Sequence, residues 1–460
     1  MKAFTASFEG LLRSWLRPGA LVYAALVVAS VWFCYSGATR HAEAQNTSHS
    51  ARDQGAYLVL GMRMADSGKV EVDGARGVLF PALLAPAWEP SLSREQYFER
   101  GKKIGIAAVL TAWVGLLFLL RRSLRPATAL TVWWALGFTV FMFYAPYVKA
   151  EGLFYALALA SFVSLLELLH RPRWTQAVVA GIFAGAAQLT KEVMLASLGL
   201  FCALQLLVAL LRAIGVWRAS RAQGARAARA ALRPILRRAL SVPIVVGVFL
   251  LTVYPQIHAN KQVFGHYFYN VNSYFYVWYD SWGEVKRGTR AHSDRSGWPE
   301  MPPEQLPSLE KYLATHSAAD IRGRIERGAS GTLESAMRSH GFFEYVCLSL
   351  LAAAATVVMT PRLRRWLVRH WHLVLFALLY FVGYYLSFSW FYVLNPGVRF
   401  VLALAGPLIF AGAWLSDRGR GRPFWFGTLG LWTIAAGASL LVDVPVLVGS
   451  AIERAKGVGM

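Results

Sequence analysis

A few ionisable side chains stand in or beside polar breaks between long apolar stretches of this sequence. They are Asp53, Glu151, Lys191 and Arg399. A carboxylate can take the proton from an attacking hydroxyl group, and basic groups can offset the charge of a leaving phosphate. These residue types favour the transfer of a group from a phosphate-linked donor to a hydroxyl acceptor.

Asp53 stands near the N-terminus of a stretch, residues 53–65, whose pattern predicts an amphipathic helix. It could be the N-cap of that helix, because a negative charge and a short polar side chain are both favoured there. It could also be a general base that takes a proton from the acceptor hydroxyl as it attacks a sugar carbon. Residue type alone favours the cap.

The other three residues also allow two interpretations each. Glu151 heads an apolar stretch, where a charged group serves as an interfacial anchor or as a site residue. Lys191, in the polar break 188–192, and Arg399, near the start of a later apolar stretch, suit the phosphate of a lipid-linked donor. Alternatively, both basic side chains reach out to lipid headgroups.

The apolar stretches indicate the framework that positions these residues. The 460-residue chain is 56% hydrophobic, which is typical of a membrane protein. About eleven stretches approach the ~20 residues of a transmembrane helix, and about ten to thirteen spans fit the pattern. They are residues 20–38, 104–120, 127–146, 151–169, 175–190, 192–211, 240–256, 342–359, 373–392, 398–415 and 424–442. We therefore predict an all-α polytopic membrane protein.

Basic residues mark every second connection between these stretches, and they account for much of the net charge of +22. The connections are 121–125, 171–173, 212–238, 362–369 and 418–422. The positive-inside rule predicts that they are cytoplasmic, together with the N-terminus. The site residues then face outward, which favours a bacterial inner membrane with a periplasmic site, although an endoplasmic reticulum membrane also fits.

This topology divides the chain into three parts. Residues 1–256 form an N-terminal transmembrane module that includes a first outer loop, 39–103; residues 257–341 form a large outer region; and residues 342–460 form the C-terminal transmembrane helices. The large outer region carries Asn272 and Asp280 in an aromatic run, and short helices are predicted at 308–316 and 318–340. Aromatic rings and polar groups suit sugar binding, and equally suit a belt at the membrane surface.

Several motifs resemble the integral membrane glycosyltransferases called GT-C, in the branch of protein O-mannosyltransferases and lipid A aminoarabinose transferases, which is like glycosyltransferase family 39. The first outer loop carries the main resemblance, in Asp53, Tyr57, Ser67-Gly68, Arg76 and Phe80-Pro81. Glu151, the segment that ends in Leu189-Thr190-Lys191, and the run from Arg399 to Pro407 also resemble family elements. The chain departs from the family at Gln54, where an acidic residue is common, and it lacks a Lys-Pro-Pro element.

The resemblance implies an inverting transfer of a sugar from a polyprenyl-phosphate-linked donor to a lipid, glycan or protein acceptor. Asp53 would be the base, and Lys191 and Arg399 would hold the donor phosphate. Sugar or acceptor would contact Tyr57, Arg76, Glu151, Asn272 and Asp280. Metal use differs within the family, and the sequence indicates neither metal ligands nor a certain cofactor. No nucleic acid partner is expected.

Two other functions are open from the sequence. A multi-pass transporter or lipid flippase would need ionisable groups or broken helices near the bilayer midplane, commonly in repeated halves. The sequence displays neither feature. The third interpretation is a catalytically silent membrane protein that keeps the glycosyltransferase scaffold.

Overall fold

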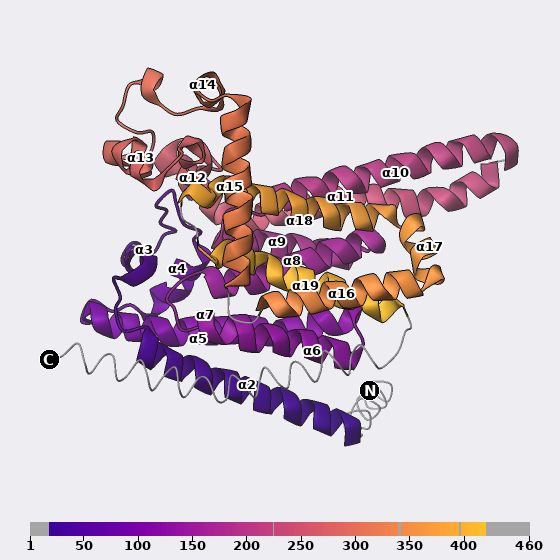
Figure 1. Cartoon of the computed structure of the whole chain (residues 1–460), viewed down its shortest axis with the longest axis horizontal. Helices are drawn as coiled ribbons and strands as arrows, with labels where there is room; N and C mark the ends of the chain where they lie inside the picture. The colour runs from indigo at the N-terminus through magenta and orange to yellow at the C-terminus, as the bar shows by residue number, and fades with distance from the viewer. Residues whose placement is uncertain (1–17, 224, 339–341, 395–396, 420–460) are drawn as a thin grey trace.

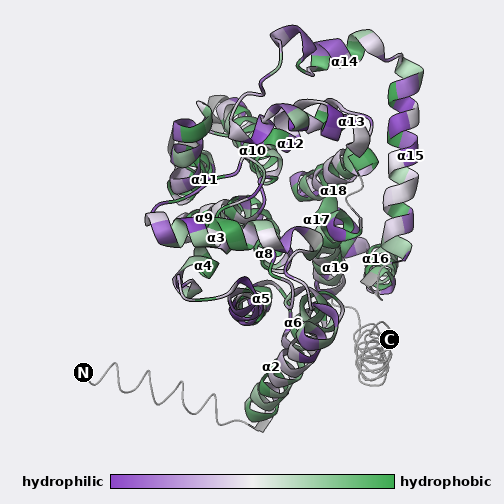
Figure 2. Ribbon diagram, turned by 90° about the vertical axis from the view of Figure 1, so that its left-hand side faces the viewer, coloured by the Kyte–Doolittle hydropathy of each residue, from purple (hydrophilic) through white to green (hydrophobic). Residues whose placement is uncertain are grey.

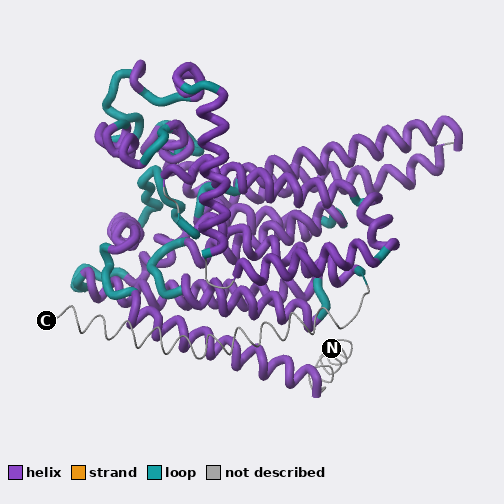
Figure 3. The backbone as a smooth tube through the Cα atoms, viewed as in Figure 1, coloured by secondary structure: helices purple, strands orange, loops and turns teal. Residues whose placement is uncertain are grey.

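A computed structural model describes residues 18–223, 225–338, 342–394 and 397–419. Throughout these residues the chain forms helices and loops, with no strand (Figure 3). The long helices lie side by side along the horizontal direction of Figure 1, and several short helices gather at one end of them. The all-α architecture predicted from the apolar stretches is confirmed.

Ten of the eleven predicted stretches are helical, and the last, 424–442, lies outside the described residues. The helices are α2 (Pro18–Gln45), α5 (Arg94–Ser123), α6 (Pro126–Leu136) continued by α7 (Met142–Tyr144), α8 (Glu151–His170), α9 (Trp174–Thr190), α10 (Leu195–Gln223), α11 (Ala225–Phe264), α16 (Phe342–Met359), α18 (Trp371–Phe391) and α19 (Arg399–Arg418).

Eight helices in the described part of the chain are long and apolar enough to cross a membrane. The count becomes nine if α16 and α17 (Pro361–Arg369), which are bent by 100° relative to each other, form one broken span. The number is below the about eleven expected from ~20-residue stretches because α9 has only 17 residues and 424–442 is not described. The chain is an integral membrane protein.

The two ends of the bundle carry different connections. At the end on the right of Figure 1, which we call the basic end, lie α17 and the far part of the α10–α11 hairpin. The described basic-end connections are 121–125, 171–173, the hairpin and 362–369. At the opposite end, which we call the outer end, lie segments 39–103, 145–150, 191–194, 257–338, 392–394 and 397–398.

Short helices build the outer end. They are α3 (Gln54–Ser67), α4 (Leu79–Leu84), α12 (Val271–Tyr274), α13 (Trp282–Arg287), α14 (Leu309–Thr315) and α15 (Ala318–Met337). Helices α3, α14 and α15 match the three predicted amphipathic helices. Figure 1 shows α15 crossing the long helices, and Figure 2 shows that hydrophilic and hydrophobic residues alternate along it. One face of α15 packs on α18.

Close packing in the centre of the bundle fixes the positions of α8 and α9 relative to their neighbours. Helix α8 contacts α5, α9, α18 and α19, and nearly all of its side chains are buried, as expected for a helix that is apolar on every face. Helix α9 packs closely on α11 through two glycines. A Cβ at Gly181 would lie 2.8 Å from the carbonyl oxygen of Val245, and one at Gly185 would lie 2.6 Å from Thr252 Cβ. Such small residues let helices approach closely.

The first outer loop rests directly on the end of α9. A Cβ at Gly77 would collide with the carbonyl oxygen of Leu189. The same loop also joins the large outer region, because the Val271 amide donates a hydrogen bond of 2.8 Å to the Gly74 carbonyl. Segments that are distant in sequence therefore meet beside Lys191, the residue that follows α9.

Candidate active site

Ion pairs join four of the predicted site residues at the outer end. Lys191 Nζ lies 3.1 Å from Glu151 Oε1, and Arg399 Nη1 lies 3.8 Å from the same oxygen. Arg399 Nη1 also lies 3.9 Å from Asp53 Oδ2. Arg76 completes the group, with its Nη2 atom 3.1 Å from Asp53 Oδ1. We call these five residues the outer ion-pair cluster.

Four members of this cluster stand at helix ends, and Arg76 lies in the loop between α3 and α4. Asp53 occupies the N-cap position of α3, Glu151 is the first residue of α8, Lys191 follows the last residue of α9, and Arg399 is the first residue of α19. The packing of α8 against α9 and α19 therefore sets the separations of Glu151, Lys191 and Arg399.

Asp53 is at the N-cap position, but its side chain makes no capping hydrogen bond. Its backbone has φ 70° and ψ 0°, in the left-handed region. An aspartate in that region is held there at a cost of roughly 1–3 kcal/mol, which the surrounding structure must offset. The carboxylate is 54% exposed and is directed to Arg76 and Arg399. The geometry thus leaves the carboxylate available to a second molecule.

Gln54 ties the start of α3 to the turn before α8. Its Oε1 atom accepts hydrogen bonds from the Asn46 side-chain amide and from the Val148 backbone, both at 2.8 Å. Its Nε2 atom donates to Asn46 Oδ1 at 2.7 Å and to the Ser48 carbonyl at 3.1 Å. A carboxylate could not make the last two bonds, because it donates no proton. The neutral amide at this position therefore holds Asp53 close to Glu151.

Arg76 is fixed by two carboxylates and an aromatic ring. Its Nη1 atom pairs with Asp73 Oδ2 at 2.5 Å, and its guanidinium lies 5.6 Å from the centre of the Tyr57 ring. Burial lowers the pKa of Arg76, but Asp73 and Asp53 outweigh that effect and leave the pKa raised. Burial also raises the pKa of Tyr57, which keeps its hydroxyl protonated. Tyr57 thus packs beneath Arg76, and its predicted contact with sugar stays a prediction.

Lys149 is a cation at this site that the sequence analysis did not single out. Burial lowers its pKa, while Glu151 and Asp53 act in the opposite direction. Its position two residues before Glu151 is the signal that could have found it. Glu151 itself has a second carboxylate oxygen, Oε2, that is buried without a hydrogen-bond partner. The Glu151 carboxylate is thus the anion around which the cations of the site are arranged.

Glu192 is a second residue that the sequence analysis missed. Gln256 Nε2 donates a hydrogen bond of 2.5 Å to its Oε1 atom. Burial raises the pKa of Glu192 to about 8, although hydrogen bonds from Asn270 and Gln256 oppose the rise. A carboxyl group whose pKa is raised therefore stands next to Lys191 in the chain.

Asn272 lies where the large outer region meets the first outer loop. Its backbone and side-chain amides donate to Asn270 Oδ1, at 2.9 and 3.0 Å, and the neighbouring Val271 amide binds Gly74. This arrangement places α12 against the loop that carries Arg76. The predicted contact of Asn272 with sugar or acceptor is not tested by these bonds.

Asp280, just before α13, belongs to a different cluster, which it forms with residues of α14 and α15 and with His316 between them. It accepts hydrogen bonds from Tyr312 Oη at 3.1 Å and His316 Nε2 at 2.7 Å, and it pairs with Arg324 Nη1 at 2.9 Å. Arg324 is buried and lies 4.1 Å from the centre of the Trp390 ring. Asp280 therefore fastens α14 and α15 to the end of α18, and among the described residues no ion pair or hydrogen bond links it to Asp53, Glu151 or Lys191.

Within the residues that the structure describes, no group of three or more histidine, cysteine, aspartate or glutamate side chains could hold a metal ion. The charges at the outer end alternate in space instead. The cations of Arg76, Lys149, Lys191 and Arg399 stand between the carboxylates of Asp53, Asp73 and Glu151. Such a site suits a polyanion that replaces the internal carboxylates as partner of the cations.

Comparison with known proteins gives few matches. No protein family model matches the chain, and no curated protein sequence matches it. Among solved structures, the chain is similar to ArnT from Cupriavidus metallidurans bound to undecaprenyl phosphate and to ArnT from the same organism in the apo state. For each, the match covers 87% of this chain and 78% of the other, with 14% sequence identity and a TM-score of 0.32.

Proposed function

We propose that this protein is a membrane glycosyltransferase that moves a sugar from a polyprenyl-phosphate-linked donor to an acceptor hydroxyl. One observation carries the proposal: the exposed carboxylate of Asp53 caps no helix and lies between Arg76 and Arg399, in the ion-pair cluster that also contains Lys191. A carboxylate that can act as a base thus stands beside basic side chains that can bind a phosphate. The resemblance of the first outer loop to GT-C enzymes agrees with these roles.

In the proposed reaction, Asp53 takes the proton of the acceptor hydroxyl, and the hydroxyl oxygen attacks the anomeric carbon of the donor sugar. The bond between that carbon and the phosphate oxygen breaks, and its electron pair leaves with the polyprenyl phosphate. The attack comes from the side opposite the phosphate, so the anomeric configuration inverts. Arg399 and Lys191 stabilise the charge that develops on the leaving phosphate.

The ion pairs indicate how the side chains would be arranged before the donor binds. Glu151 holds Lys191 and Arg399 in place before a phosphate arrives. A donor phosphate offers both cations more acceptor oxygens, so we expect Arg399 to turn from Asp53 to the phosphate and to free the base. Both cations stand at the outer ends of apolar helices, where a lipid-linked phosphate would lie.

The proposed setting is a bacterial inner membrane with the outer end in the periplasm. The support is the charge of the loops, because the described basic connections all lie at the other end. A transporter or flippase would instead call for ionisable groups near the middle of the bundle. The outer ion-pair cluster stands at helix ends, which favours surface chemistry over transport.

The test compares Asp53→Asn with Asp66→Asn, a matched change on the same helix α3. Each variant is reconstituted in nanodiscs with undecaprenyl-phosphate-linked hexoses or pentoses and a total lipid and glycan extract as acceptor, and the release of undecaprenyl phosphate is followed by mass spectrometry. We expect Asp53→Asn to lower the turnover rate by about 100-fold or more, since it removes the base. Asp66→Asn should leave the rate unchanged. Full turnover by the Asp53→Asn variant would show that the carboxylate is not the base.

A further inference from the structure

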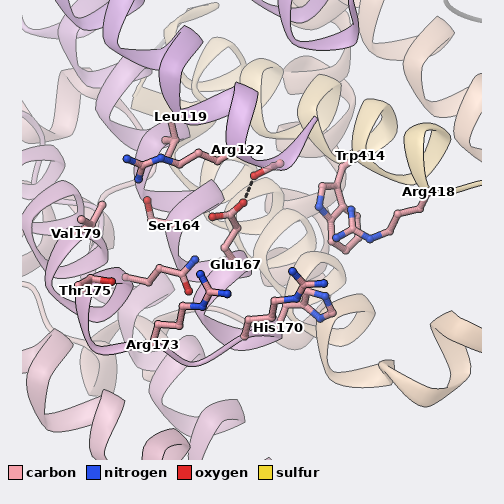
Figure 4. Close-up of a pocket in the computed structure, with 13 residues that line it drawn as sticks. Leu119, Arg122, Ser164, Glu167, His170, Arg173, Thr175, Val179, Trp414 and Arg418 are labelled. Atoms are coloured by element: carbon pink, nitrogen blue, oxygen red, sulfur yellow. Dashed lines mark hydrogen bonds between the residues drawn. The ribbon is translucent and has the colours of Figure 1, made fainter. Parts of the chain in front are cut away.

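A cavity of about 520 Å³ opens at the basic end of the bundle. It lies between the last turns of α5, α8 and α19 and the first turn of α9, as Figure 4 shows. Helix α8 has Glu151 as its first residue and His170, which lines the cavity, as its last. A helix of 20 residues is ~30 Å long, so the cavity and the outer ion-pair cluster are separate sites.

Basic side chains dominate the cavity. Four arginines line it, Arg122, Arg171, Arg173 and Arg418, against the single carboxylate of Glu167. Glu167 is already engaged, because its Oε1 atom accepts a hydrogen bond from the Ser123 hydroxyl. In the described part of the chain, Arg122, Arg171 and Arg173 form no ion pair with a carboxylate. The cavity is therefore strongly electropositive.

Three polar atoms in the wall are buried without a hydrogen-bond partner: Ser164 Oγ, His170 Nδ1 and Gln176 Oε1. Ser164 is only 4% exposed, and its side chain is directed into the cavity in Figure 4. Buried polar groups are nearly always paired, so these orphans indicate a polar ligand; the Ser164 hydroxyl and the His170 ring can donate to an anion, whereas the Gln176 oxygen only accepts. The first turn of α9 adds backbone amides, because its N-cap residue Arg173 makes no side-chain cap.

Arginines at the last turns of helices have an ordinary role as well, since a cation is favourable at a helix C-terminus. That role fits Arg122 and Arg418, the latter stacked 3.5 Å from the centre of the Trp414 ring. This role does not account for the cavity between the helices, for Arg173 at the N-terminal end of α9, or for the three buried polar atoms that lack a hydrogen-bond partner. These features together need a further explanation.

We propose that this cavity binds a phosphate group. The guanidinium groups, the amides of α9 and the Ser164 hydroxyl supply donors for a phosphate monoester or diester. The phosphate could belong to an anionic phospholipid of the adjacent leaflet or to a free phosphate ion. Leu119 and Val179, on two long helices beside the arginines, provide an apolar wall for a lipid. The proposal is independent of the proposed transfer reaction.

The test uses the full chain, purified in detergent and stripped of lipid. Two probes are added separately, dioleoylphosphatidylglycerol and inorganic phosphate, with dioleoylphosphatidylcholine as the zwitterionic reference. Binding is measured by native mass spectrometry for the lipids and by the shift in melting temperature for phosphate. The site variant is Arg171→Gln with Arg173→Gln, and the matched control is Arg233→Gln with Arg237→Gln, two exposed arginines of α11 that do not line the cavity.

We expect the site variant to bind the probe about tenfold more weakly than the wild type, the effect of ~1.4 kcal/mol, while the control pair changes binding little. A second variant, Thr175→Trp, fills the cavity without removing charge, and it should weaken binding too. Binding of phosphatidylglycerol alone assigns the site to a lipid headgroup, and binding of inorganic phosphate assigns it to the free ion. Equal binding by wild type and both site variants, or equal loss in the control pair, overturns the proposal.

Discussion

The basic side chains at the two ends of the bundle differ in their ion pairing. At the outer end, Arg76, Lys191 and Arg399 each pair with a carboxylate of the chain. At the basic end, the cavity arginines Arg122 and Arg171 have no such partner within the described residues. Internal pairing fixes side chains in advance, whereas unpaired arginines take their counter-charge from elsewhere. The contrast suggests a preorganised reaction site at one end and a binding site for an external anion at the other.

The largest effect expected from this contrast concerns Arg399. The change Arg399→Gln removes a cation that we assign to the leaving phosphate, so the turnover rate should fall by about 100-fold. Steady-state release of undecaprenyl phosphate measures it. Arg364→Gln, on the exposed surface of α17 at the basic end, is the control and should have no effect. Similar losses in both variants would remove the distinction between the two ends.

The next prediction concerns the amide that fixes the outer end. Gln54→Glu buries a carboxylate and leaves Asn46 Oδ1 and the Ser48 carbonyl without their donor. The free energy of unfolding should fall by about 3 kcal/mol, seen as a lower melting temperature in detergent. Gln96→Glu is the matched change. Gln96 is the N3 residue of the α5 capping box, where Glu is favourable, so that variant should stay as stable as the wild type.

The next prediction tests whether the contacts of Asp280 with Tyr312, His316 and Arg324 have only a structural role. Asp280→Asn weakens the ion pair with the buried Arg324 but leaves the outer ion-pair cluster intact. Stability should fall by about 1–2 kcal/mol because the pair is partly exposed, while the turnover rate per folded molecule stays unchanged. Thermal melting and the transfer assay measured on the same sample separate these outcomes. A lower turnover rate with an unchanged melting temperature would instead support the sequence-based prediction that Asp280 contacts the sugar or acceptor.

The last prediction is a pH dependence of stability that arises from Glu192. The pKa of this carboxyl is raised in the folded protein from an ordinary value of 4.5 to about 8. Between these values the folded state holds a proton that the unfolded state has lost, so stability falls as pH rises from 4.5 to about 8. Glu192→Gln should flatten this part of the melting-temperature profile. Glu310→Gln, an exposed control, should keep the wild-type slope.

The sequence was sufficient to predict the long apolar helices, because apolar length and loop charge are local properties of the chain, but it did not predict the short helices α4, α12, α13 and α17. It also identified Asp53, Glu151, Lys191 and Arg399 as residues of one end, and the structure brings them into one cluster. The detailed partners were not predictable. The ion pair of Arg76 with Asp53, the left-handed backbone of Asp53 and the separate cluster of Asp280 depend on how distant segments pack.

The basic-end cavity also could not be predicted from the sequence. Its arginines were visible in the sequence as loop charges, and the positive-inside rule gave them a sufficient explanation. Only the packing of α5, α8, α9 and α19 reveals that they surround a hollow. Loop charge therefore predicts which end a residue occupies, but not whether it binds anything there.

Gly77 shows that the absence of one atom can control the spacing of a site. The first outer loop touches the backbone at the end of α9 because Gly77 has no side chain. A single methyl group there would collide with the backbone of Leu189 and Thr190, so the loop beside Arg76 would have to shift relative to the end of α9. Gly77, which has no functional group, thus sets the distance between the proposed base Asp53 and the proposed phosphate-binding Lys191, and a design that alters this distance would begin at Gly77.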